Sequence, residues 1–100
     1  MVKRLAKRED ILRSAMELTT GDRRAAYGDP YINHKRIADI WSVLLDWEVT
    51  PSQVALCMVG VKLARIVETP DHLDSFIDGA AYMAIAAEIT EKGVKDEERT

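Results

Sequence analysis

The chain has 100 residues, of which 47% are hydrophobic and 31% are charged, with one cysteine and a formal net charge of -3. These values describe a single globular domain without a disulfide framework, in keeping with a reducing cytoplasm. The longest apolar run, residues 54–61, is far shorter than the roughly 20 residues that a membrane span needs, and the charged N-terminus is no signal peptide. We therefore expect a cytoplasmic protein with no membrane partner.

Two amphipathic helices are predicted in the first half of the chain. Residues 8–18 place apolar side chains on one face, and Thr19, Thr20 and Gly21 end this helix. Asp29 is a suitable N-cap for a second helix with Pro30 in its first turn, extending to about residue 48.

The second half of the chain predicts two more helices. Thr50 and Pro51 repeat the cap-and-start pattern for a helix over residues 51–68. The segment TPDH ends that helix and starts the last one, which runs to about Lys92 with Gly93 as its C-terminal stop. The sequence thus predicts an all-α, four-helix single domain over residues 1–93, followed by a charged tail over residues 94–100.

The two later helices are apolar on nearly all sides. Between residues 54 and 67 only Lys62 and Arg65 are neither apolar nor glycine, and between residues 76 and 87 only Asp78 is charged. Two amphipathic helices are too few to cover both, so we expect a homo-oligomer, a dimer or higher, that completes a helical bundle.

Charge is unevenly distributed along the sequence. Residues 1–36 contain nine Lys or Arg and five Asp or Glu, whereas residues 37–100 contain five and twelve. Cations at the start of the second helix face the positive end of its dipole, which raises the question of an anionic partner. His34 in that turn is interpreted either as a half-buried helix histidine or as an anion contact. The chain lacks zinc spacing, a glycine-rich phosphate loop and an aromatic RNA-binding pattern, so nucleic acid is not the expected partner.

A charge cluster is predicted inside the apolar helices. If residues 51–68 and the last helix form an antiparallel hairpin, Arg65 lies beside Asp74 and Asp78, and Lys62 lies near Asp78 and Tyr82. One interpretation is a structural network of ion pairs that fixes the hairpin register. The other is a ligand site in which Asp74 and Asp78 hold a divalent cation such as Mg²⁺ or a ribose, while the cations hold phosphate.

Three segments together resemble a small uncharacterised domain of tailed phages and prophages. The segments are RRAAYGDPYINHKRIADIW, PSQVALCMVGVKLARI and DHLDSFIDGAAYMAIAAEI, and the resemblance covers about residues 20–90. The matching positions are Arg23, Tyr27, Gly28, Asp29, Pro30, Asn33, His34, Ala38, Trp41, Lys62, Arg65, Asp74, Asp78 and Tyr82.

The helical order is also distantly similar to the MazG-like all-α nucleoside triphosphate pyrophosphohydrolases. That resemblance implies an oligomeric helical bundle with Mg²⁺ held by acidic motifs on two successive helices. The present chain departs from it, because Lys62 and Arg65 occupy positions where carboxylates are expected and the last helix has D-x-x-x-D instead of E-x-x-D.

Three functions follow as hypotheses. The first is a phage-encoded protein that binds a nucleotide without catalysis, for example by sequestering a host signalling or metabolic nucleotide. Its phosphate would meet Asn33, His34 and Arg36, with Arg23 or Arg24 closing over it, and its base would stack on Tyr27 or Trp41. The other wall would be formed by Lys62, Arg65, Asp74 and Asp78, and Tyr82 is a further candidate for ligand contact. The second is a divergent Mg²⁺-dependent nucleotide pyrophosphohydrolase, and otherwise no cofactor is expected. The third is a structural module, or one that contacts protein or nucleic acid through Lys3, Arg4, Lys7 and Arg8.

Overall fold

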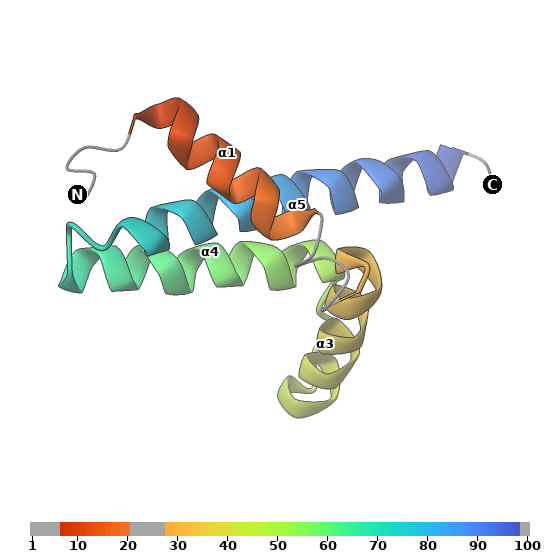
Figure 1. Ribbon diagram of the computed structural model, residues 1–100. Helices are drawn as coiled ribbons and strands as arrows, with labels where there is room; N and C mark the ends of the chain where they lie inside the picture. Colours follow the sequence, from red (N-terminus) through yellow and green to blue (C-terminus); the bar gives the residue numbers. More distant parts are fainter. Residues whose placement is uncertain (1–6, 21–27, 99–100) are drawn as a thin grey trace.

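The described residues, 7–20 and 28–98 of a computed structural model, form four helices and no strand, which confirms the all-α prediction (Figure 1). Their bounds are Arg8–Thr19 (α1), Pro30–Leu45 (α3), Pro51–Glu68 (α4) and Leu73–Glu98 (α5). Helices α4 and α5 form a long antiparallel hairpin. Helix α1 crosses α5 on one side of it, and α3 leads away from the N-terminal end of α4. None of the described helices is long and apolar enough to cross a membrane.

Helix α3 begins as predicted but ends earlier. Asp29 accepts a hydrogen bond from the Tyr31 amide at 3.2 Å, and Pro30 occupies the first turn. The helix stops at Leu45, three residues before the expected end, because Asp46 adopts a left-handed conformation (φ 53°). The Ser42 hydroxyl then accepts a hydrogen bond from the Val49 amide at 2.8 Å, which holds the connection to α4 against α3.

A reciprocal capping box starts α4 at the predicted residue. The Thr50 hydroxyl accepts from the Gln53 amide at 3.2 Å, and the Gln53 side-chain oxygen accepts from the Thr50 amide at 2.9 Å. Both hydrogen bonds satisfy backbone donors that a helix start otherwise leaves unpaired. These two hydrogen bonds therefore fix the N-terminal end of α4, where the hairpin of α4 and α5 begins.

We predict that Thr50→Ala lowers the free energy of unfolding by about 1 kcal/mol, because the Gln53 amide loses its acceptor. Urea unfolding followed by circular dichroism measures this. Ser52→Ala is the matched control, since the Ser52 hydroxyl lies 3.4 Å from that of Thr50 but takes no part in the capping box. Equal effects of the two substitutions would show that the cap contributes no stability.

Helix α5 does not stop at Gly93 as predicted but continues to Glu98. A glycine ends a helix when it adopts a positive φ, and among the described residues only Gly28 and Asp46 do so. Lysine and glutamate after Gly93 are good helix formers, which favours continuation of the helix past this glycine.

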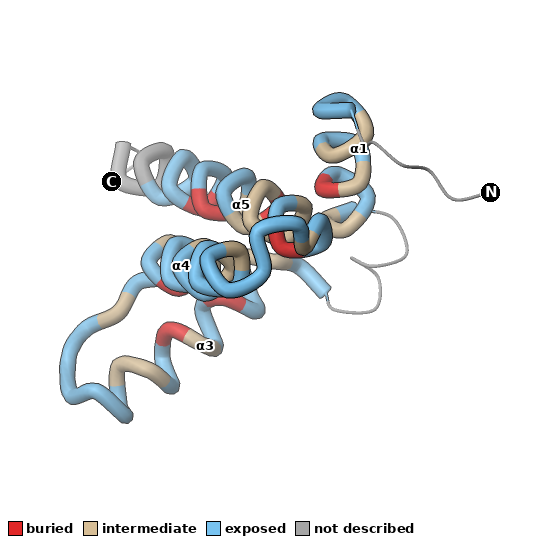
Figure 2. The backbone as a smooth tube through the Cα atoms, turned by 90° about the vertical axis from the view of Figure 1, so that its left-hand side faces the viewer, coloured by how far each residue is buried: buried red, intermediate tan, exposed pale blue. Residues whose placement is uncertain are grey.

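The buried core is small. Its apolar members have at most 7% exposed surface and are Ala15, Ala38, Val54, Ala55, Ala81, Ala86 and Ile89. Large apolar side chains remain exposed along the same helices, as the pale blue stretches of α3, α4 and α5 indicate in Figure 2. The prediction that α1 and α3 cannot cover α4 and α5 is therefore confirmed for one chain, while the oligomer stays a prediction.

Candidate functional site

A cavity of about 410 Å³ lies where the end of α1 and the start of α3 approach the middle of the hairpin. Five of the predicted site residues line it, and they come from three helices: Asn33, His34, Lys62, Asp78 and Tyr82. The remaining lining residues are Leu18, Thr19, Gly28, Pro30, Ala81 and Ile85. The volume falls within the range of about 300–1,000 Å³ typical of small-molecule sites.

The first turn of α3 forms one wall of this cavity. Gly28, with a φ of 81°, and the cap residue Asp29 bring the chain into the helix, so that Pro30, Asn33 and His34 line the cavity. A positive φ is readily available to glycine because it has no Cβ. The backbone amides at a helix start carry partial positive charge, which favours an anion nearby.

His34 is buried, with 5% of its surface exposed. Its Nδ1 donates to the Pro30 carbonyl at 2.7 Å, since a carbonyl only accepts, and the ring meets Tyr82 edge-on with centroids 6.2 Å apart. Nε2 makes no hydrogen bond within the described residues. Every buried side-chain nitrogen or oxygen among these residues has a hydrogen-bond partner, so Nε2 is not a buried atom and reaches accessible space. The structure thus shows His34 as a buried helix histidine, and its role as an anion contact stays a prediction.

Lys62 and Asp78 form the opposite wall as an ion pair. Lys62 Nζ lies 3.2 Å from Asp78 Oδ2, with side-chain exposures of 20% and 34%, so both charges are partly removed from water. This contact confirms the predicted register of the hairpin. A cation and a carboxylate at one cavity wall suit a ligand that carries both an anionic group and hydroxyl donors.

Other predicted site residues lie away from this cavity. Arg36 and Arg65 are exposed and Trp41 is half-buried, and none of the three lines it. The expected pairing of Arg65 with Asp74 and Asp78 is absent among the described residues, since Arg65 lies on the exposed side of α4. Arg23, Arg24 and Tyr27 fall outside the described residues.

A second cavity, of about 480 Å³, lies between α1 and α5 and includes both residues of the predicted metal pair. Glu17, Asp74 and Asp78 line it, together with Ser14, Leu18 and Ile77. The described residues nevertheless contain no group of three His, Cys, Asp or Glu side chains close enough to hold one metal ion, and Asp78 already faces Lys62. A Mg²⁺ site at Asp74 and Asp78, in which a ligand phosphate completes the coordination, therefore stays a prediction.

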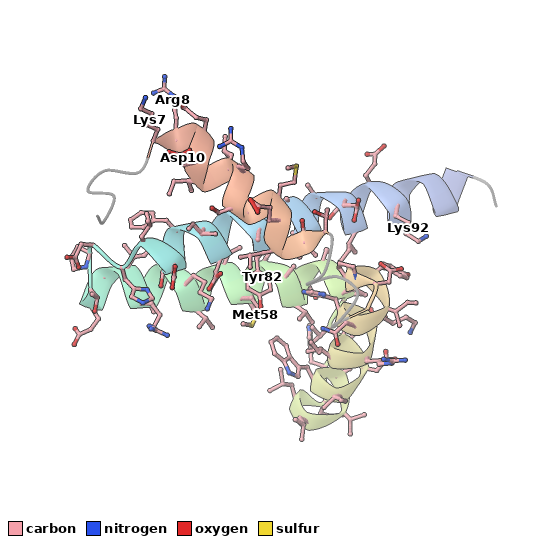
Figure 3. All side chains as sticks on the ribbon, viewed as in Figure 1. Lys7, Arg8, Asp10, Met58, Tyr82 and Lys92 are labelled. Carbon is pink, nitrogen blue, oxygen red and sulfur yellow. The ribbon has the colours of Figure 1, made fainter. Side chains whose placement is uncertain are left out.

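The described residues of the basic N-terminal segment, Lys7 and Arg8, line neither cavity. Lys7 and Arg8 are exposed at the start of α1, as Figure 3 shows, whereas Tyr82 lies in the middle of α5 where that helix passes α1 in the same view. Lys3 and Arg4 lie outside the described residues. The end of α1 contributes only Leu18 and Thr19 to the first cavity, a role that amphipathic periodicity did not reveal.

The chain is similar to two phage proteins and to one domain family. Residues 10–90 match the Domain of unknown function (DUF6378). The Gene 55 protein of Mycobacterium phage D29 is 40% identical over 91 residues, which cover 91% of this chain and 60% of the relative. The Gene 55 protein of Mycobacterium phage L5 is 40% identical over 76 residues, which cover 75% of this chain and 49% of the relative. The chain therefore spans about half to three fifths of these relatives. No solved structure matches it.

The chain belongs to the DUF6378 family, and its relatives from phages D29 and L5 confirm the resemblance to a phage domain.

Proposed function

We propose that this phage-type domain binds a nucleotide in the cavity between α1, α3 and the hairpin. The supporting observation is that residues far apart in the sequence meet there with complementary chemistry. The start of α3 and Lys62 offer positive charge, Asp78 offers a hydroxyl acceptor, and Tyr82 with His34 offers ring surface. A nucleotide has a matching phosphate, ribose and base.

The free Nε2 of His34 strengthens this proposal. The nitrogen belongs to a buried ring whose other nitrogen is fixed by the Pro30 carbonyl, so the ring orientation is set before any ligand arrives. A preorganised polar group reduces the ordering that binding requires. Sequestration of a host signalling or metabolic nucleotide in the host cytoplasm needs such a site and no chemical step.

The test measures the melting temperature against mono-, tri- and cyclic nucleotides, with and without Mg²⁺, and follows each nucleotide by chromatography. A nucleotide at a hundred times its dissociation constant should stabilise the folded protein by about 2.7 kcal/mol. An upward shift with intact nucleotide is the expected result. Consumption of the nucleotide would instead identify a divergent MazG-like pyrophosphohydrolase, and no shift with any nucleotide would contradict the proposal.

We predict that Asn33→Asp weakens nucleotide binding at least tenfold without unfolding the protein. Asn33 is exposed, is the fourth residue of α3 and lines the cavity. A carboxylate near a helix N-terminus stabilises the helix but repels the phosphate of a ligand. Titration calorimetry with the best nucleotide of the panel measures the loss.

Gln53→Glu is the matched control for this substitution. It makes the same change from amide to carboxylate near the start of α4, at a residue that does not line the cavity. Binding should be unchanged in this variant. If Asn33→Asp and Gln53→Glu behaved alike, the ligand would bind elsewhere.

A further inference from the structure

The hairpin contains a buried row of residues that sets its geometry. On α5 this row consists of Ser75, Gly79, Tyr82 and Ala86, and on α4 of Ala55, Val59, Lys62 and Ile66, each of them buried or half-buried. A Cβ added at Gly79 would lie 3.8 Å from Cβ of Lys62, which fixes the register of the two helices at their centre. These positions repeat every three or four residues, as in helices that pack side by side.

A second row follows the buried one by a single residue on each helix, and it is apolar and largely uncovered. On α4 the row consists of Leu56, Gly60, Leu63 and Val67, all exposed. On α5 it consists of Phe76, Ala80, Met83 and Ala87, of which only Ala80 is half-buried. The exposed row on α4 and the exposed row on α5 contain no charged residue, and both keep the spacing of three and four residues that is typical of a helix-packing seam.

The two rows lie on the same side of the hairpin. One residue turns a helix by 100°, in the same sense when viewed along each chain. Because α4 and α5 run antiparallel, a rotation of 100° away from the contact between the two helices points both exposed rows to the same face of the hairpin. We call this face the open face. Helix α1 lies on the other side, since Asp78, Ala81 and Ile85 approach α1 and each precedes the buried row by one residue. Figure 2 likewise shows α1 on one side of the α4–α5 pair only.

The open face is large enough for a stable interface. Helix α4 has 18 residues and is therefore about 27 Å long, and two packed helices are about 20 Å wide. A flat face of that size measures on the order of 500 Å², so two such faces bury about 1,000 Å², the lower bound for a specific complex. Leu63 and Val67 are 58% and 82% exposed, so an isolated chain leaves most of this apolar surface in water.

We infer that the open face binds the open face of a second copy, which makes an antiparallel four-helix bundle from two hairpins. A second copy fits better than a foreign partner because the buried apolar core, in the part of the chain whose burial is described, consists of five alanines, one valine and one isoleucine. Such a core needs cover whenever the chain is folded. The face also alternates large and small residues: a Cβ at Gly60 would meet nothing within 4 Å, which leaves a hollow for a large side chain of the partner. This inference does not depend on nucleotide binding.

Light scattering during size-exclusion chromatography tests the inference. The protein should have twice the chain mass of 11.2 kDa, and Leu63→Glu should reduce it to one chain mass. Leu44→Glu is the matched control, because Leu44 is 75% exposed near the end of α3 and belongs to neither row of the open face. A monomeric wild-type protein would overturn the inference, as would dissociation by Leu44→Glu but not by Leu63→Glu.

Cross-linking keeps the test decisive if Leu63→Glu fails to fold. In a Cys57→Ser background, Leu63→Cys should cross-link between chains through a bismaleimide that spans about one interhelical distance, 8–10 Å. Leu44→Cys in the same background should not. Absence of a cross-linked dimer from folded Leu63→Cys protein, or cross-linking only through Leu44→Cys, would overturn the inference.

Discussion

Lys62→Met should lower the free energy of unfolding by about 1–3 kcal/mol and also remove stabilisation by nucleotide. Lys62 and Asp78 are 20% and 34% exposed, so loss of the cation leaves a partly buried carboxylate without its partner. The cost falls between the 0–1 kcal/mol of exposed pairs and the roughly 3–5 kcal/mol of fully buried ones. Urea unfolding measures the first effect, and the nucleotide-induced shift in melting temperature measures the second.

The pair Lys35 and Asp39 provides a matched control for burial. Lys35 Nζ lies 3.2 Å from Asp39 Oδ2, the same distance as in the hairpin pair, but the side chains are 57% and 68% exposed. Lys35→Met should therefore cost less than about 0.5 kcal/mol. If Lys35→Met and Lys62→Met cost the same, burial would contribute nothing to the hairpin pair.

The double variant Lys62→Met/Asp78→Asn separates the structural role of the pair from its proposed binding role. With both charges removed, the uncompensated charge disappears and most of the lost stability should return, because replacing a whole pair is often close to neutral. Binding should not return, since the cavity has lost its lysine and its carboxylate. A double variant that recovers nucleotide binding along with stability would show that the pair serves only the fold.

Much of the fold was predictable from local signals. Thr50 with Pro51 and Asp29 with Pro30 are strong helix starts, and both helices begin there. Helix ends were harder: Gly93 was expected to stop α5 although a glycine stops a helix only in a left-handed turn. Asp46 takes the left-handed conformation instead and ends α3, as aspartate does more readily than most residues with a side chain.

The candidate site was predictable where one helix pair determined it and not where several helices meet. The Lys62–Asp78 contact follows from counting along an antiparallel hairpin, and the structure confirms it. Counting failed for Arg65, because a side chain three residues along a helix lies some 60° around its axis and here reaches solvent. Asn33 and His34 line the same cavity as this pair because α3 packs on the hairpin. The spacing of residues along one helix does not predict how two helices pack.

Val54→Asp should abolish folding, the largest effect expected of any substitution in this chain. Val54 has no exposed surface and is among the largest fully buried side chains. A carboxylate there would lose its hydration without a cationic partner, at a cost of several kcal/mol. Small domains are stable by only about 5–15 kcal/mol, and a core made mostly of alanine places this chain at the low end. Circular dichroism should show loss of the helical signal at 25 °C.

Val43→Asp is the matched control for this substitution, since Val43 is 81% exposed near the end of α3. Its melting temperature should stay within a few degrees of that of the wild-type protein, because the new carboxylate remains in water. The two valines have the same side chain and differ in burial alone, so the contrast measures how much the small core contributes. A folded Val54→Asp protein would mean that this position is not enclosed as its lack of exposed surface indicates, and unfolding by Val43→Asp would mean that the end of α3 is covered by another chain.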